Sequence, residues 1–448
     1  MGLDPTRTPR PFQAVTIAAP SVDPLVVARG RGDLSVYWEQ PSEGVAAAAF
    51  GCVARREAMD RPSALDLLQE LADPHQIAWL GSEPIQGMPG PWLGGLAFDL
   101  SRVPSPEWRG FPAARWLLPE LLLWRRGART FLTGFAPGEP GAAERLHEKL
   151  ATARAHLPHG AWQPLPQPPL LQTRADREDW ARLVRVSLDA IDSGSLSKVV
   201  GARVIHATAA APFEPLEVLA RLRAYAPGCT TFLFRGEGTV YLGATPETLC
   251  RIDGRLLETE ALAGSAAPGE PLERLESDKE RREHDAVTDA LRDGLAPLCE
   301  HLEIERTPRR LVLPNVVHLR TPIRARLRPE AGPAEVVRAI HPTPAVGGTP
   351  RDRSLAFLRE HEGFHRGWYA GAVGWIGSSA AELRVALRSA LLDGARARLF
   401  VGAGLVAGSR EADEWHETEA KSLPLLRVLD GGPAEREPAP APHGLICV

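Results

Sequence analysis

Lysine, paired cysteines and long apolar runs are all scarce in this 448-residue chain. Of 52 lysine and arginine residues, only four are lysine: Lys149, Lys198, Lys279 and Lys421. The five cysteines lie far apart and form no CxxC pair, which argues against a disulfide or zinc framework and leads us to expect a reduced, cytoplasmic protein. Since arginine supplies nearly all of the positive charge, each lysine is a candidate for a more specific role.

The chain also lacks the features of membrane proteins and of nucleic-acid-binding proteins. Its most apolar stretch, WLLPELLLW at 116–124, carries Pro and Glu and is too short to span a bilayer. The opening residues MGLDPTRTPRPF have no apolar core, so we expect no secretory signal. The net charge of -4 is small, and no basic block or acidic tail is present. We therefore expect no membrane and no nucleic acid among its partners.

Proline and glycine mark the expected domain boundaries. Residues 158–173, PHGAWQPLPQPPLLQT, contain five prolines and are predicted to be a linker. An N-terminal α+β region is expected at 1–157 and a catalytic domain at 174–429. The Gly/Pro/Ala-rich end at 430–448 is predicted to be a disordered tail.

The hydrophobic periodicity alternates between strands and helices. Helices are predicted from about 142 to 156, from 177 to 194, from 277 to 298 and from 411 to 429. Strand pairs turn at Gly-Glu-Gly and Asp-Gly, and residues 370–406 are predicted to form a three-strand antiparallel meander. Consecutive antiparallel strands with interspersed helices favour an α+β fold over a doubly wound parallel sheet.

One lysine interrupts an apolar strand pattern, SKVVGARVIH at 197–206. Side chains alternate between the faces of a strand, so Lys198 shares a face with Val200 and Ala202. A lysine there lies either at the rim of a sheet or partly buried. Unlike arginine, a buried lysine can lose its proton.

Two predicted helices each carry a pair of glutamates three residues apart. Glu280 and Glu283 share a face of the first helix, and Glu414 and Glu417 share a face of the last. Together the two pairs could hold Mg²⁺, which prefers oxygen ligands and is often completed by an anionic substrate. The alternative for each pair taken alone is a solvated helix face.

Other motifs carry weaker signals. HEGFH at 361–365 matches the zinc-protease pattern HExxH, but Gly363 interrupts the helix and no third ligand follows, so a helix end with two exposed histidines is preferred. The backbone of VGAG at 401–404 could hold an anion or form a simple turn. Arg388, among apolar strand residues, could meet a substrate carboxylate or an internal ion pair.

Taken together, nine stretches between about 175 and 428 resemble the chorismate-binding enzymes, in that family's order and spacing. They are KVVGAR, GATPETL, ETEALAGS, SDKERREH, HPTPAVGG, RGWYAGAVGW, ALRSALL, VGAGLV and EWHETEAK. The resemblance implies large antiparallel sheets in a two-lobed, sandwich-like core flanked by helices. It also implies a chorismate substrate and Mg²⁺ as cofactor.

Within this family the resemblance implies an isochorismate synthase, an isomerase serving menaquinone or siderophore biosynthesis. Lys198 would activate water to attack C2 of chorismate, and Glu247 would protonate the departing C4 hydroxyl. Mg²⁺ would be held by Glu280, Glu283, Glu414 and Glu417. The residues implied to contact the substrate are Gly264, Ser265, His318, Ala345, Tyr369, Arg388, Gly402, Gly404 and Lys421.

Particular positions separate the branches of the family. Anthranilate synthases have a similar pattern, but with glutamine at the place of Lys198. Aminodeoxychorismate synthases have a nucleophilic lysine where this chain has Ala263. In salicylate synthases, the similar stretches have threonine at the place of Ala345 and tyrosine at the place of Tyr369. This chain shares the tyrosine but not the threonine, so the two positions give a mixed signal. A salicylate synthase is therefore the main alternative, and a non-catalytic subunit with an amidotransferase partner is the second. We expect a monomer without an obligate amidotransferase subunit.

Overall fold

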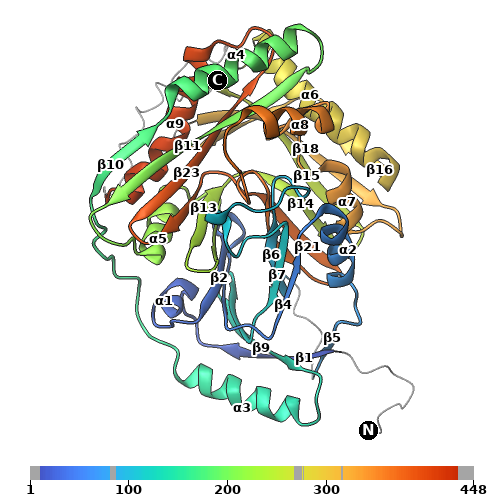
Figure 1. Ribbon diagram of the computed structural model, residues 1–448. Helices are drawn as coiled ribbons and strands as arrows, with labels where there is room; N and C mark the ends of the chain where they lie inside the picture. Colours follow the sequence, from blue (N-terminus) through green and yellow to red (C-terminus); the bar gives the residue numbers. More distant parts are fainter. Residues whose placement is uncertain (1–10, 81–86, 267–274, 276, 314–315, 432–448) are drawn as a thin grey trace, which may run out of the picture.

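The computed structural model describes residues 11–80, 87–266, 275, 277–313 and 316–431. Two large β-sheets pack face to face, and helices cover them (Figure 1). Among the described residues all strand pairings but one are antiparallel, the exception being the short parallel pair of β1 with β5. The predicted α+β class with large antiparallel sheets is confirmed. The tail predicted at 430–448 lies almost wholly outside the described residues.

The first sheet combines strands from both ends of the chain. Along the sheet the order is β10-β11-β23-β22-β13-β12-β2-β3-β8-β9-β1-β5, and β19 pairs with β11. Its members are β1 (Phe12–Ala19), β2 (Leu34–Gln40), β3 (Val45–Phe50), β5 (Ile77–Trp79), β8 (Leu121–Arg126), β9 (Arg129–Pro137), β10 (Leu170–Ala175), β11 (Lys198–Ala209), β12 (Thr230–Arg235), β13 (Val240–Thr245), β19 (Gly348–Thr349), β22 (Ser389–Asp393) and β23 (Arg396–Leu405).

The second sheet is built in the same mixed way. Its order is β16-β18-β15-β14-β21-β20-β6-β7-β4, and β17 pairs with β18. Its members are β4 (Ala54–Ala58), β6 (Trp92–Leu96), β7 (Ala114–Leu118), β14 (Thr248–Asp253), β15 (Leu256–Ala266), β16 (Cys299–Ile304), β17 (Arg309–Leu313), β18 (Val316–Leu327), β20 (Ala372–Ile376) and β21 (Ala380–Val385).

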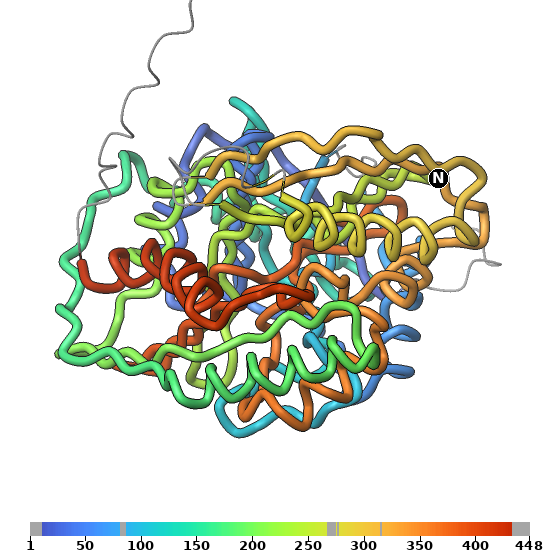
Figure 2. The backbone as a smooth tube through the Cα atoms, turned by 90° about the horizontal axis from the view of Figure 1, so that it is seen from above, coloured from blue at the N-terminus to red at the C-terminus, as the bar shows by residue number. Residues whose placement is uncertain are grey.

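Helices lie on the outer faces of the sheets and at the end where β11 and β23 meet β15 (Figures 1 and 2). Within the described residues, none is long and apolar enough to cross a membrane. The helices are α1 (Pro24–Arg29), α2 (Arg61–Leu71), α3 (Ala142–Ala155), α4 (Arg177–Asp192), α5 (Pro215–Tyr225), α6 (Asp278–Leu295), α7 (Pro333–Ile340), α8 (Arg351–His361) and α9 (Glu411–Leu429).

Strand alternation divides the apolar side chains between two cores. In β12, Phe232 and Phe234 point into the space between the sheets, and Leu233 points outward toward the helices. The core between the sheets also contains Trp38 of β2 and Trp92 of β6. Because both faces of the first sheet are covered, its strands read as nearly continuous apolar runs rather than as a clean alternation.

Both sheets cross the expected domain boundary. In the first sheet Phe232 pairs with Trp38, and in the second Gly374 pairs with Gly94. The residues before 140 thus extend the same two sheets that the later residues form. The division into an N-terminal region and a catalytic domain stays a prediction about chain segments; β10 begins at Leu170, within the predicted linker.

The predicted three-strand meander at 370–406 is wrong. This segment forms four strands: β20 and β21 lie in the second sheet, and β22 and β23 lie in the first. The chain passes from one sheet to the other between Val385 and Ser389. Arg388 therefore lies in a connection rather than within a strand, and its backbone has a φ of 48°. The apolar alternation continues through the crossing, so periodicity could not reveal it.

Candidate active site

A small cavity of about 90 Å³ lies where β11 and β23 of the first sheet meet β15 of the second, beside α6 and α9. Most of the predicted site residues line it, and four do not. The four that do not are Lys198, Glu280, Glu414 and Glu417. Lys198 is paired with Glu283, Glu280 and Glu414 with Lys279, and Glu417 with Lys421. The predicted residues in the lining are Glu247, Gly264, Ser265, Glu283, His318, Ala345, Tyr369, Arg388, Gly402, Gly404 and Lys421.

Lys198 is the first residue of β11, and its side chain is completely buried. Its Nζ lies 3.1 Å from Oε1 of Glu283 on α6, which supplies the counter-charge. The angles of this contact do not meet hydrogen-bond geometry, so the ammonium has an ion pair but no hydrogen bond within the described residues. The alternative of a rim lysine is therefore excluded.

Glycines bring the backbone close to this lysine and to its partner. Lys198 pairs with Thr349 of β19, and a Cβ on Gly348 would lie 2.4 Å from the carbonyl oxygen of Lys198. On the other edge of β11, a Cβ on Gly404 would lie 2.1 Å from Oε1 of Glu283. Only glycine leaves room for these approaches, so the VGG and VGAG motifs shape the site through close packing.

Lys279 bridges the two helices that carry the glutamates. Its Nζ donates a 2.7 Å hydrogen bond to Oε1 of Glu414 on α9 and lies 3.7 Å from Oε1 of Glu280 on α6. Burial disfavours the charged form of Lys279, but the attraction of Glu414 outweighs it and raises the pKa of the lysine. The sequence had singled out Lys279 as one of four lysines without giving it a role.

Lys421 and Ser265 hold the remaining glutamate. Glu417 lies 2.6 Å from Nζ of Lys421 and accepts a 2.9 Å hydrogen bond from the Ser265 hydroxyl. Burial opposes ionisation of Glu417, but Lys421 and Ser265 outweigh it and lower the pKa of the carboxyl to about 2. The backbone N–H of Ser265 donates to Glu280, so this one residue joins both glutamate pairs.

The four glutamates suit a divalent cation in their donor chemistry. Burial and the nearby Glu283 raise the pKa of Glu280 to about 7, and burial and Glu417 raise that of Glu414. Oε2 of Glu414 is buried and accepts no hydrogen bond from any described residue. Oxygen atoms that are buried, mutually repelling and incompletely satisfied fit Mg²⁺. In the described residues no three such side chains converge on one point, and lysine ammonium groups contact all four.

Glu247 lies in the short connection between β13 and β14, on the lining of the cavity. Its backbone N–H donates to Oγ1 of Thr245, and its carbonyl accepts from Val385, so the turn is fixed at both ends. Burial, followed by the charge of Glu260, raises the pKa of Glu247 to about 8, against a smaller opposing effect of Lys198. The carboxyl is therefore protonated at neutral pH, as a general acid requires.

Arg388 and His318 form a basic side of the cavity. An Arg388 guanidinium nitrogen lies 3.4 Å from Nε2 of His318, whose Nδ1 lies 3.3 Å from the Gly264 carbonyl. Burial and the charge of Arg388 lower the pKa of His318 to about 3, so the imidazole is neutral. Lys421 extends this side, with its Nζ donating to the Gly402 carbonyl at 3.1 Å. These groups can receive an anionic ligand.

Tyr369 and Phe400 form an aromatic wall of the cavity. Their rings are stacked, with centroids 5.2 Å apart and planes at 18°. A Cβ on Gly402 would lie 3.1 Å from the Tyr369 hydroxyl, so the tyrosine reaches over the β23 backbone. Ala345 lies in the same lining.

Arg366 is a site residue that the sequence reasoning missed. It lines the cavity, donates to the carbonyls of Val346 and Val200, and forms a buried ion pair with Glu362. This explains the glutamate of HEGFH, which also accepts from the Ala202 N–H. His365 is buried, so the expectation of two exposed histidines is wrong. Its Nδ1 accepts from the Gly367 N–H at the turn after α8.

Comparisons with known proteins identify the family of this chain. The family model described as "Chorismate binding enzyme" matches residues 6–430. The chain is 34% identical to the salicylate biosynthesis isochorismate synthase of Pseudomonas aeruginosa, over 93% of this chain and 90% of the relative. It is 32% identical to the isochorismate synthase MenF of Bacillus subtilis, over 76% of this chain and 75% of the relative.

Solved structures share the fold along nearly the whole chain. The menaquinone-specific isochorismate synthase MenF from Escherichia coli superposes with a TM-score of 0.76 at 28% identity, covering 94% of this chain and 95% of that one. Anthranilate synthase component I from Streptococcus pneumoniae, at 20% identity and a TM-score of 0.71, shows the fold alone. The family match along residues 6–430 and the 34% identity over most of both chains are decisive, and the chain belongs to the family of chorismate-binding enzymes.

Proposed function

We propose that this protein is an isochorismate synthase, which converts chorismate to isochorismate by adding water at C2 and releasing the hydroxyl at C4. The observation that carries the proposal is Lys198, completely buried at the start of β11 and 3.1 Å from Glu283. The isochorismate synthases among its relatives support the same reaction. Because one water enters and one leaves, the net change is an isomerisation. The product would feed menaquinone, siderophore or salicylate synthesis in the cytoplasm.

Lys198 is proposed to accept a proton from the attacking water. The residue is completely buried and is held by an ion pair with Glu283, so its side chain is fixed in position. To act as a base, Lys198 would have to release its own proton first. Arginine at this position would keep its proton.

Glu247 is proposed to protonate the leaving C4 hydroxyl. Its carboxyl lines the cavity and holds its proton at neutral pH, since its pKa is raised to about 8. A carboxyl that keeps its proton at the operating pH is typical of a general acid.

Glu280, Glu283, Glu414 and Glu417 are proposed to hold Mg²⁺, and Arg388 with Lys421 to receive a substrate carboxylate. An ion held by these residues would supply positive charge for an anionic substrate. The backbone of Gly402 and Gly404, with Gly264, Ser265, His318, Ala345 and Tyr369, would surround the ring; all of them line the cavity. The chain acts as a monomer in this proposal, without an amidotransferase subunit.

Product analysis tests this proposal directly. Chorismate is incubated with the purified protein, with and without Mg²⁺, and the products are separated by chromatography. We expect Mg²⁺-dependent isochorismate with little salicylate. Salicylate and pyruvate as main products would instead favour a salicylate synthase. The observation that supports this alternative is the position of Tyr369 in the cavity. Unchanged chorismate would overturn the enzymatic proposal and leave a binding protein.

Lys198→Ala is expected to lower the rate of water addition by at least about 10²-fold, because the proposed base is lost. Lys198→Arg is expected to fail as well, since arginine stays protonated. The matched control is Lys149→Ala, which removes an exposed lysine paired with Glu120 at 2.6 Å. Full turnover in Lys198→Ala with an unchanged circular dichroism spectrum would remove the base assignment; turnover in Lys198→Arg would mean that the residue only orients water.

The pH dependence of kcat/KM should reveal the proton on Glu247. A group that must donate a proton is active below its pKa, so kcat/KM is expected to fall by about tenfold per pH unit above about 8. Glu247→Gln cannot donate that proton and is expected to lose at least about 10²-fold in rate. A rate that stays level up to pH 10, or an active Glu247→Gln variant, would contradict the assignment.

Glu417→Gln is expected to weaken Mg²⁺ binding by at least about tenfold, measured both by calorimetry and by the Mg²⁺ concentration that half-saturates activity. The reason is the loss of one anionic oxygen from the proposed ligand set. Glu419→Gln on the exposed side of α9 is the control and should leave both values unchanged. Equal Mg²⁺ titrations for Glu417→Gln and the unmodified protein would exclude this residue as a ligand.

A further inference from the structure

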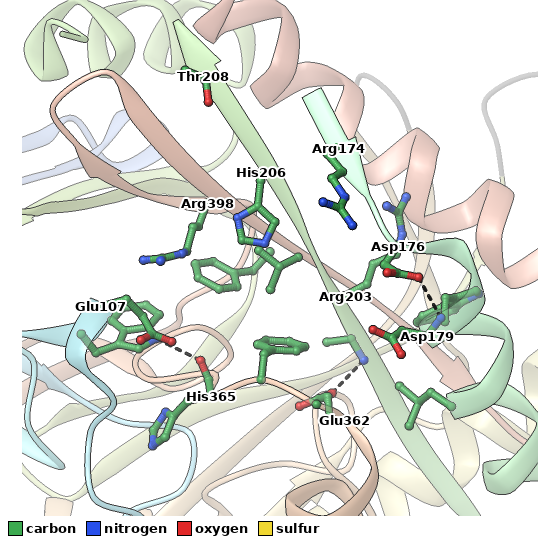
Figure 3. A pocket seen from close by; sticks show the side chains of 18 of the residues that line it. Glu107, Arg174, Asp176, Asp179, Arg203, His206, Thr208, Glu362, His365 and Arg398 are labelled. Carbon is green, nitrogen blue, oxygen red and sulfur yellow. Dashed lines mark hydrogen bonds between the residues drawn. The ribbon is translucent and has the colours of Figure 1, made fainter. Parts of the chain in front are cut away.

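A second, larger cavity lies further along the same face of β10, β11 and β23, and it has no part in the proposed reaction (Figure 3). Its volume is about 650 Å³, within the roughly 300–1,000 Å³ typical of small-molecule sites. On β11 its lining continues the alternate positions that start at Lys198, through Ala202, Val204 and His206. Phe400 is the side chain that lines both cavities and separates them.

Three basic side chains form a row across this cavity. Arg174 of β10 pairs in register with His206 of β11, and His206 pairs with Arg398 of β23. Figure 3 shows the three side by side. Neighbouring strands lie about 4.8 Å apart, so the two arginine backbones are about 10 Å apart, and both guanidinium groups can reach a ligand placed between them.

Neither arginine of this row has an internal counter-charge. Within the residues that the structure describes, Arg174 and Arg398 make no ion pair and no side-chain hydrogen bond. The pKa of His206 is lowered by burial and by the charges of Arg398 and Arg174, which reports the positive potential at the centre of the row. Forty-eight arginines make unpaired guanidinium groups common on this surface, but these two converge on a cavity.

The acidic residues of the cavity are mostly satisfied elsewhere. Asp176 caps α4 by accepting the Asp179 N–H at 3.0 Å, and Asp179 itself binds Arg182 at 3.0 Å. Glu362 is held by Arg366. Asp176 and Glu107 make no ion pair with a described residue, and Glu107 lies beside the Arg398 end of the row in Figure 3. With Arg203, the lining holds three arginines that make no ion pair with a described residue, and they outnumber these two carboxylates.

An aromatic surface lies next to the basic row. Phe364, half-buried, is stacked on Phe400 with centroids 6.3 Å apart, and Trp108 is stacked on the same ring at 5.4 Å. Val204 is also half-buried and lies in register with Phe400, two pairs along the strands from the basic row. An apolar ring placed here would cover these exposed carbon atoms while its anionic group met the arginines.

We propose that this cavity binds a small carboxylic acid that carries an apolar ring. Its carboxylate lies between Arg174 and Arg398 and accepts from His206, and its ring packs on Phe364 and Phe400. The charge-assisted hydrogen bonds supply specificity for an anion, and the aromatic side chains supply specificity for the ring. The site is distinct from the proposed active site and depends on none of its residues except the shared wall at Phe400.

Benzoate is the probe, with benzamide as its uncharged counterpart and inorganic phosphate as an anion without a ring. Binding is measured by calorimetry on the full chain. We expect a benzoate dissociation constant on the order of 1 mM, ordinary for a ligand of this size, and binding at least about tenfold weaker for benzamide and for phosphate. Equal binding of phosphate would overturn the role of the ring, and equal binding of benzamide would overturn the role of the charge.

Variants locate the binding. Arg398→Gln and Arg174→Gln are each expected to weaken benzoate binding by roughly tenfold. Arg396→Gln is the matched control: it removes the same charge from the same strand, but its partner is Asp393 and its side chain is exposed. Arg388→Gln controls for binding in the smaller cavity. Benzoate binding that survives Arg398→Gln but not Arg388→Gln, or no binding at any accessible concentration, would overturn the proposal; thermal unfolding verifies that each variant is folded.

Discussion

The pairing of one buried and two half-buried lysines with glutamates fixes the geometry on which the rest of the site depends. Burying a charge costs several kcal/mol unless an opposite charge is held beside it. Lys198 on β11, Lys279 on α6 and Lys421 on α9 each meet at least one glutamate from these two helices. A shift of either helix would leave buried charges unpaired, so the pairing ties α6 and α9 to the first sheet. Segments 135 residues apart in the sequence are thereby held within ion-pair distance by Lys279 and Glu414.

Aromatic residues that precede the predicted linker pack against the wall of the site. Trp108, from the connection before β7, stacks on Phe400 at 5.4 Å and meets Tyr241 edge-on at 5.2 Å. Phe111 packs against Trp368, two residues after Arg366. Rings of this size bury large apolar areas and hold their neighbours in defined orientations. The wall that carries Phe400 therefore depends on the N-terminal strands and their connections as much as on β23.

Sequence reasoning recovered what is local and missed what depends on tertiary partners. The i, i+3 spacing placed Glu280 with Glu283 and Glu414 with Glu417 on inward helix faces, and all four glutamates are buried or nearly so. Spacing along one helix could not show that Lys279 crosses to the other helix. Alternation likewise could not assign β20–β23 to two different sheets, because each sheet buries side chains at the same period of two. The row of Arg174, His206 and Arg398 needs the strand register, which no single segment encodes.

The unequal use of lysine and arginine follows from what each cation can do. An ammonium is compact and fits between two carboxylates, as Lys279 does between Glu280 and Glu414. It can also release its proton when buried, which a guanidinium cannot. Three of the four lysines lie in the one site where these properties matter, and the fourth, Lys149, lies on the surface. Where a planar, permanently charged group serves, as in the basic row of the larger cavity and in the Arg366 clamp on Glu362, the chain uses arginine. The composition that first singled out Lys198 thus matches a structure in which three of the four lysines are paired with glutamates of α6 and α9.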